Sequence, residues 1–144
     1  MSKQLVRFDP WAVMRDFDQA MIPGTTLGGA RRQGTWLPRI DVFEDEGALK
    51  LFVELAGVDA EAVEVTQEGR TLTIRGTRTL VGEDFTGTAH RREILEGDFE
   101  RKVRLPQGFD GESITASSVD GILEVVIPLL PEVQPRKVAV TTQR

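Results

Sequence analysis

The chain has 144 residues, 40% of them hydrophobic and 28% charged, with a net charge of −5 and no cysteine. This length suits one domain with a substantial core, and the net negative charge argues against nucleic acid or an anionic membrane surface as the main partner. The absence of cysteine excludes disulfides, thiolate metal sites and thiol nucleophiles.

We expect residues 1–36 to form an N-terminal arm, in which a short amphipathic helix precedes a flexible linker. Asp9 can cap the helix, Pro10 suits its first position, and a Pro-Gly pair at 23–24 ends it. Large apolar residues, which we call the N-terminal stripe, recur along it at roughly helical spacing: Phe8, Trp11, Met14, Phe17 and Met21. A helix this short is unstable alone in water, so the stripe needs a partner.

Residues 37–128 show the pattern of strands separated by turns. Apolar and polar residues alternate over residues 49–55 and 99–105, which is typical of half-buried strands. Asp120 followed by Gly121 is a strong signal for a two-residue hairpin turn. Short strands at this spacing, with almost no helix, predict an all-β, antiparallel β-sandwich.

A long polar segment, residues 77–98, interrupts the strand pattern. A structureless loop of that length inside a compact domain is unusual. We therefore expect the segment to carry an extra strand that pairs elsewhere, on a second subunit.

Residues 129–144 form a C-terminal extension with a V-x-V pattern. Val138 and Val140 are two residues apart, so they point to the same side of an extended segment. The polar tail has no partner strand nearby in sequence, and the valine pair suits docking on another sheet edge, on this chain or on a neighbour. The alternative is a frayed terminus that carries two valines by chance.

Five segments stand out together: FDPW at 8–11, LPRIDV at 37–42, FVELAGV at 52–58, GDFERKVRLP at 97–106 and ASSVDGIL at 116–123. In this order and at these separations, they resemble the small heat-shock proteins of the bacterial type, which are the Hsp20 family with its α-crystallin domain. The resemblance covers about residues 8–140 and implies an immunoglobulin-like antiparallel sandwich.

The resemblance implies an ATP-independent chaperone, a holdase that binds partly unfolded proteins and prevents their aggregation under stress. It implies no cofactor, and it implies that ATP-dependent chaperones act downstream on the complexes. The N-terminal stripe is the candidate client-binding surface, because methionine and aromatic side chains adapt to many partners. Alternatively, the stripe packs on the chain's own sandwich or in an oligomer interface, and it can alternate between the two states.

The resemblance also implies a homodimer, in which a strand inside the long loop crosses to the partner's sheet. That strand should lie near residues 88–93, which include His90, Arg91, Arg92 and Glu93. The family's interface arginine falls on Arg101, which stands among apolar alternates and so points inward or to an interface. A charge there needs a carboxylate partner. The sequence leaves three candidates open: Glu93, Glu96 and Asp98.

The family's tail motif docks between the fourth and eighth strands of a neighbour, and that groove maps onto Val63, Val65, Ile114 and Ala116. Whether the tail uses its own groove or a neighbour's stays open. The commonest tail has isoleucine at both positions, and each missing methylene is worth about 0.8 kcal/mol. Two of them weaken each tail contact roughly fifteenfold. We therefore expect small or readily dissociating assemblies.

Other classes of function have less support in the sequence. A p23-like co-chaperone, a specific adaptor for one folded partner, is the main alternative on the same sandwich. A carbohydrate-binding sandwich would need exposed aromatic platforms, whereas both tryptophans, Trp11 and Trp36, lie outside the predicted sandwich. Ser117 and Ser118 have no base beside them, since the single histidine is distant in sequence, so we expect no enzyme.

We expect no metal site, because transition metals in proteins are bound mainly through histidine and cysteine. No stretch of the chain is long and apolar enough to span a bilayer, and the first ten residues lack the apolar core of a signal peptide. A cytoplasmic location is the resulting expectation.

Overall fold

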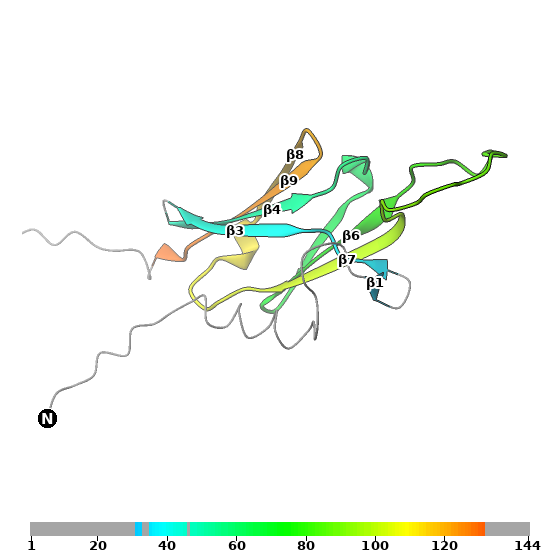
Figure 1. Ribbon diagram of the computed structural model, residues 1–144. Coiled ribbons are helices and arrows are strands. Elements are labelled where there is room, and N and C mark those ends of the chain that lie inside the picture. The colour runs from blue at the N-terminus through cyan, green and yellow to red at the C-terminus, as the bar shows by residue number, and fades with distance from the viewer. Residues whose placement is uncertain (1–30, 33–34, 46, 132–144) are drawn as a thin grey trace, which may run out of the picture.

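The computed structural model describes residues 31–32, 35–45 and 47–131. Two β-sheets pack face to face over these residues (Figure 1). Sheet A has the strand order β1-β2-β7-β6-β5, and sheet B has the order β3-β4-β9-β8.

The strands of sheet A are β1 (Arg31–Arg32), β2 (Thr35–Trp36), β5 (Glu64–Glu68), β6 (Thr71–Arg78) and β7 (Gly97–Arg104). Those of sheet B are β3 (Ile40–Asp45), β4 (Ala48–Glu54), β8 (Thr115–Val119) and β9 (Ile122–Pro128). Two short 3-10 turns, η1 (Ala60–Ala62) and η2 (Gly111–Ser113), precede β5 and β8. The predicted all-β sandwich is confirmed, and its strands pair antiparallel except where β2 lies parallel to β7.

The core lies between the two sheets and follows from the period-two alternation of the strands. In β4, Leu49, Leu51 and Val53 are fully buried, while the residues between them face outward. The inner residues of the neighbouring strands complete the core, among them Leu72, Ile74, Phe99, Val125 and Ile127. Burial of these side chains is the main force that holds the two sheets together.

The predicted hairpin between β8 and β9 is confirmed. Asp120 and Gly121 have φ angles of +52° and +80°, the left-handed conformation that both central residues of a type I′ turn require. Glycine adopts this conformation without steric cost, and aspartate tolerates it. The turn fixes the register in which Val119 pairs with Ile122.

The prediction that Trp36 lies outside the sandwich is wrong. Its side chain is 3% exposed, its ring centroid lies 5.0 Å from that of Phe99, and its indole N–H donates to the Gly97 carbonyl at 3.0 Å. A two-residue strand gives no readable alternation, so the sequence alone placed Trp36 in the linker. The sandwich therefore uses residues that come before position 37.

Gly76 is needed because the Phe99 ring lies directly against its backbone. A Cβ atom at position 76 would lie 2.8 Å from Phe99 Cζ and 3.2 Å from the Ala62 carbonyl oxygen. Any larger residue would push the ring out of its place beside Trp36.

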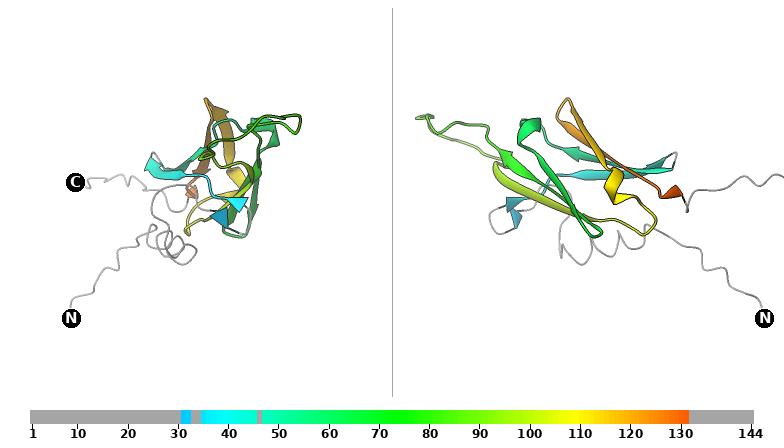
Figure 2. Two further views of the ribbon diagram at one scale, coloured as in Figure 1. Left: turned by 45° about the vertical axis from the view of Figure 1, so that its right-hand side comes forward. Right: turned by 180° about the vertical axis from the view of Figure 1, so that it is seen from behind.

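The long segment between β6 and β7 forms a loop, residues 79–96, that projects away from both sheets (Figures 1 and 2). Its residues 79–94 are exposed and form no strand in the single chain. The expected pairing of this loop with a second subunit stays a prediction.

Candidate functional site

A groove of about 270 Å³ lies where β5, at one edge of sheet A, meets β8, at one edge of sheet B. Its lining residues are Val65, Thr66, Gln67, Leu72, Gly111, Ile114 and Ala116. Three of the four residues predicted for a tail-docking groove, Val65, Ile114 and Ala116, thus come together in one cavity. Val63 does not line it, because it caps η1 and packs partly buried against the core.

Both walls of the groove are edge strands. Among the described strands, β5 pairs with β6 and β8 pairs with β9, so each leaves one side of its backbone without a strand partner. Such edges accept an extended peptide, and apolar pockets beside them accept alternate side chains. The groove can therefore hold a short extended segment whose apolar residues are two positions apart.

Acidic residues flank the lining of the groove in the sequence, and we call them its acidic rim: Glu68 follows Gln67, and Asp110 and Glu112 lie on either side of Gly111. Glu68 and Glu112 are exposed, and neither is in an ion pair within the described part of the chain. The pKa of Asp110 is lowered because the Ser113 hydroxyl and the Glu112 N–H donate to its carboxylate. This rim favours a ligand with basic residues next to its apolar ones.

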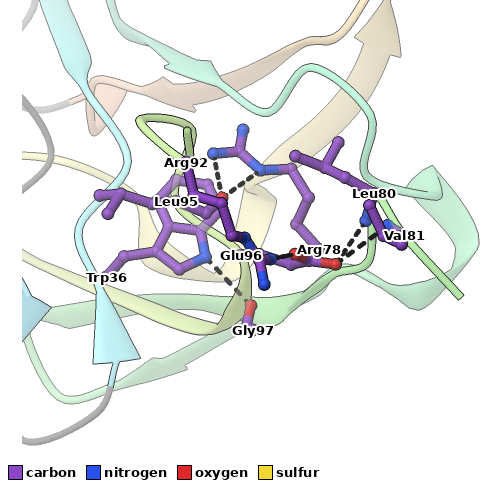
Figure 3. A network of polar contacts seen from close by, with 8 residues as sticks. All are labelled: Trp36, Arg78, Leu80, Val81, Arg92, Leu95, Glu96 and Gly97. Carbon is purple, nitrogen blue, oxygen red and sulfur yellow. Dashed lines mark hydrogen bonds and ion pairs between the residues drawn. The ribbon is translucent and has the colours of Figure 1, made fainter. Parts of the chain in front are cut away.

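A second cluster holds the base of the long loop (Figure 3). Arg78, only 8% exposed, has its guanidinium carbon 4.0 Å from the centroid of the Trp36 ring. Its Nε and Nη2 donate to the Leu95 carbonyl at 2.8 and 2.6 Å, and its Nη1 donates to the Ala56 carbonyl at 3.2 Å. One side chain therefore connects the end of β6, the far end of the loop and the segment after β4.

Glu96 completes this loop-base cluster. Its carboxylate accepts the backbone N–H groups of Leu80 at 2.8 Å and Val81 at 3.1 Å, and it pairs with Arg92. The N–H groups of Val81 and Leu80 are the main reason that the pKa of Glu96 is lowered. Both ends of the loop are thus tied together, which fixes the direction in which the loop leaves the sandwich.

Sequence reasoning missed Arg78. An arginine at the end of a strand reads as a solvated charge, and its partners Ala56 and Leu95 lie 22 and 17 residues away. The only available signal was an indirect one, since a buried guanidinium often lies over a tryptophan ring.

The residues predicted for a dimer interface lie on two different elements. In the long loop, His90 is exposed, Arg91 pairs with Glu93 at 3.2 Å, and Arg92 pairs with Glu96. Arg101 lies in β7 and is half-buried. It lies on the same, inner side of the strand as the buried Phe99 and Val103.

The carboxylates considered for Arg101 have other neighbours. Glu93 and Glu96 pair with arginines of the loop, and the Asp98 carboxylate accepts the Thr77 hydroxyl at 2.6 Å. Arg101 thus lies at the sandwich, as expected, while its role in a dimer stays a prediction.

The N-terminal stripe (Phe8, Trp11, Met14, Phe17 and Met21) and the tail pair (Val138 and Val140) lie outside the described residues. Within the described ranges, no group of three or more His, Cys, Asp or Glu side chains could hold a metal ion. None of the helices in that part of the chain has the length and apolar character needed to cross a membrane.

Comparison with known proteins identifies the family to which this sandwich belongs. The model of the Hsp20/alpha crystallin family matches residues 41–141. Spore protein SP21 of Stigmatella aurantiaca is 32% identical over 115 residues, which are 78% of this chain and 68% of that protein.

Two solved structures match the fold. The hspA protein of Xanthomonas axonopodis has a TM-score of 0.62 at 35% identity, covering 67% of this chain and 97% of that one. A small heat-shock protein from Xylella fastidiosa, described as having a distinct high order structure, has a TM-score of 0.63 at 32% identity, covering 75% of this chain and 99% of that one.

The fold and its relatives define a small heat-shock chaperone with an α-crystallin sandwich. The chain belongs to the Hsp20/alpha crystallin family. The resemblance inferred from the sequence is confirmed, and the co-chaperone alternative is not favoured.

Proposed function

We propose that the chain is an ATP-independent holdase, which binds partly unfolded proteins and prevents their aggregation under stress. The observation that carries this proposal is the apolar groove between the two open strand edges β5 and β8. Unfolding proteins expose extended apolar segments, and such an edge can accept them while the chain's own tail is not docked there. Binding lowers the concentration of free unfolded chains by mass action and needs no nucleotide.

The N-terminal stripe is the proposed client-binding surface. Its two methionines are flexible and its three aromatic residues supply large apolar contacts, so the stripe can adapt to many unrelated clients. We place this activity in the cytoplasm, where ATP-dependent chaperones would resolve the client complexes. The stripe needs neither a catalytic group nor a cofactor.

The homodimer forms, in this proposal, through the long loop. The strand expected near residues 88–93 would pair with β3 of a second copy, since β3 is an edge strand that pairs with β4 alone among the described strands. The loop-base cluster supports the exchange because it holds the loop clear of its own sandwich. Arg101 would stabilise the same interface, so Arg101→Ala should weaken the dimer and promote aggregation.

Higher assembly would use the tail. Val138 and Val140 have the two-residue spacing that suits the β5–β8 groove, and Arg136 and Lys137 immediately precede them. The acidic rim of the groove complements that basic pair.

A matched pair of substitutions tests the groove. Ala116→Arg places a long side chain in the cavity, whereas Ser117→Arg places the same side chain on the opposite face of β8. The first substitution should reduce the mean particle size in sedimentation experiments, and the second should leave it unchanged. Equal effects of the two substitutions would count against docking in this groove.

The holdase activity is tested by light scattering from two unrelated heat-labile proteins, warmed with increasing amounts of the full chain and no ATP. Suppression that nears completion at about equimolar ratio for both clients is the expected result. Suppression of neither client would refute a general holdase and favour an adaptor for one folded partner.

A truncation tests the role of the stripe. Removing residues 1–30 should abolish client protection and leave a folded sandwich, because β1 and β2 are kept. A cut at residue 36 would remove Trp36 from the core and confuse loss of the stripe with loss of stability. Full protection by the shorter chain would show that the stripe does not bind clients.

A further inference from the structure

The described part of the sandwich has four strand edges, and three of them carry features that oppose pairing with another sheet. In sheet A, β1 has only two residues, and β5 has a glutamate at each end, Glu64 and Glu68. In sheet B, β3 carries Asp41, Glu44 and Asp45. Very short edge strands and charged side chains are common protections of a sheet edge.

The fourth edge, β8, has neither of these protections (Figure 1). Its five residues, Thr115–Val119, include no charged residue, proline or glycine, and all five are exposed. Among the described strands, β8 pairs with β9 alone. Such a strand offers the free side of its backbone to another extended segment.

The hairpin turn determines which backbone groups β8 presents at its free side. In a hairpin with a two-residue turn, the flanking residues, here Val119 and Ile122, exchange both backbone hydrogen bonds. The direction of these bonds alternates along an antiparallel strand, so Ser117 also bonds to β9. Ala116 and Ser118 therefore direct their N–H and C=O groups to the free side.

Pairing of β8 with β8 of a second copy satisfies these groups. In an antiparallel arrangement centred on Ser117, Ala116 of each copy lies opposite Ser118 of the other, and these residues exchange hydrogen bonds. Thr115 then lies opposite Val119, which is a favourable cross-strand pair of β-branched residues. Val119 is 68% exposed in the single chain, so the pairing would cover an apolar side chain.

The same arrangement is unfavourable at the other two edges of more than two residues. Antiparallel self-pairing about the middle of β5 places Glu64 of each copy opposite Glu68 of the other. Self-pairing about the middle of β3 places Asp41 opposite Glu44. Like charges directly opposite each other destabilise a strand pair, so these edges resist what β8 permits.

The charges closest to β8 do not oppose one another in the paired arrangement. Glu124 lies on β9 opposite Ser117, so the two copies of Glu124 would be three strand spacings, about 14 Å, apart. This separation exceeds the Debye length of about 8 Å at physiological ionic strength. Asp120, in the hairpin turn, would lie opposite Ile114 of the other copy.

We propose that β8 is an adhesive edge, through which two copies pair antiparallel about Ser117, and that the docked tail prevents this pairing. A tail in the β5–β8 groove would cover β8 with an extended segment, and covering is a further way to protect an edge. Release of the tail would then expose a self-association site as well as the groove. This inference rests on the tail docking proposed above.

Disulfide trapping tests the pairing, because the chain has no cysteine of its own. Ser117→Cys places a thiol at the centre of β8, and pairing would bring two such positions together with their Cα atoms about 4.5 Å apart, within reach of a disulfide. Thr66→Cys is the matched control, since Thr66 is the central, exposed residue of β5, the other five-residue edge. Both are measured in the full-length chain with the tail blocked by Val138→Asp and Val140→Asp.

With the tail blocked, oxidation should link Ser117→Cys chains into pairs at least tenfold faster than Thr66→Cys chains, as measured on a gel without reducing agent. Restoring the two valines of the tail should slow the Ser117→Cys link at least fivefold. Equal rates at the two positions would overturn the pairing. A Ser117→Cys link that is equally fast with either tail would overturn the protection by the tail.

Sedimentation of the tail-blocked chain gives a readout that needs no cysteine. Its mean mass should rise with protein concentration beyond that of the loop-exchanged dimer, and Ser117→Arg should abolish this rise because two arginines would then lie opposite each other. Thr66→Arg, which adds the same charge to β5, should leave the rise unchanged. In the original chain the docked tail already covers β8, so Ser117→Arg stays neutral there.

The outcomes separate the pairing from the tail docking on which it rests. Persistence of the rise in the Ser117→Arg chain would refute the pairing alone. If Ala116→Arg fails to change the particle size of the original chain, the tail docking is refuted, and with it the protection of β8 by the tail.

Discussion

Replacing Arg78 with alanine should destabilise the sandwich more than any other change to its charged residues. The substitution removes the guanidinium from the Trp36 ring and leaves the carbonyl groups of Leu95 and Ala56 without their donor. A hydrogen bond to a charged group contributes about 1.5–3 kcal/mol, and a partly desolvated cation–π contact contributes about 1–2 kcal/mol. Two of the three hydrogen bonds share one acceptor, so we expect a total loss of about 3 kcal/mol.

A loss of this size is large against the stability of about 5–15 kcal/mol that a domain typically has. The free energy of unfolding of a small domain falls by about 2 kcal/mol per molar urea, so this loss lowers the urea midpoint of unfolding by about 1.5 M. The midpoints must be compared at one protein concentration, because association also stabilises the folded chain. Arg78→Lys should give an intermediate loss, since lysine keeps the charge but lacks the fork that reaches two carbonyl groups.

Arg75→Ala is the matched control, because it removes the same side chain from the same strand. Arg75 forms two hydrogen bonds of 2.9 Å with Glu64, but the pair is exposed and its charges are screened by water. The midpoint of this variant should stay within error of the original chain. If the Arg78→Ala and Arg75→Ala midpoints coincide, the account of the loop-base cluster is wrong.

Three further predictions concern other parts of the molecule. The pKa of Glu96 is lowered by backbone N–H donors, so the stability that its carboxylate contributes is present above its unfolded pKa and is lost as the pH falls through the lowered pKa. Glu96→Gln should therefore destabilise the chain at pH 7, and urea titrations at decreasing pH should show this destabilisation shrinking once the pH falls below the ordinary range of a glutamate pKa. Gly76→Ala should cost about 1–3 kcal/mol in thermal unfolding, because its new methyl group meets an aromatic ring at 2.8 Å, whereas Gly82→Ala, which meets nothing within 4 Å, should be neutral. Changing Val138 and Val140 to isoleucine should tighten assembly roughly fifteenfold in a sedimentation dilution series, and an original chain that stays one large particle below micromolar concentration would contradict this.

The regular parts of the sandwich could be predicted because their signals are local. Alternating burial in β4 follows directly from alternating residue types, and the Asp120–Gly121 turn needs a conformation that few other pairs adopt. Val65, Ile114 and Ala116 were placed in one groove by family resemblance, and no local pattern links segments so far apart in the sequence.

Trp36 and Arg78 could not be predicted, because their environment is made by distant segments. Trp36 follows a Gly- and Arg-bearing stretch that reads as a linker, yet it packs on Phe99 from another strand. Arg78 reads as a surface charge until its two carbonyl acceptors are brought beside it by the fold. Burial of a single side chain depends on tertiary neighbours more than on its own sequence window.

The polar outer face of sheet A bears on the shape of any assembly. Copies that join through the groove and the β3 edge leave the outward side chains of β5, β6 and β7, which are all polar or charged, directed to water. Such a subunit binds other copies on one side and faces water on the other, as a surfactant molecule does in a micelle. Growth then favours closed, curved particles over open fibres, and mutual repulsion between subunits that each have a net charge of −5 keeps those particles dispersed. Bound client proteins would then lie inside the particle, and the polar outer faces of sheet A would form its surface.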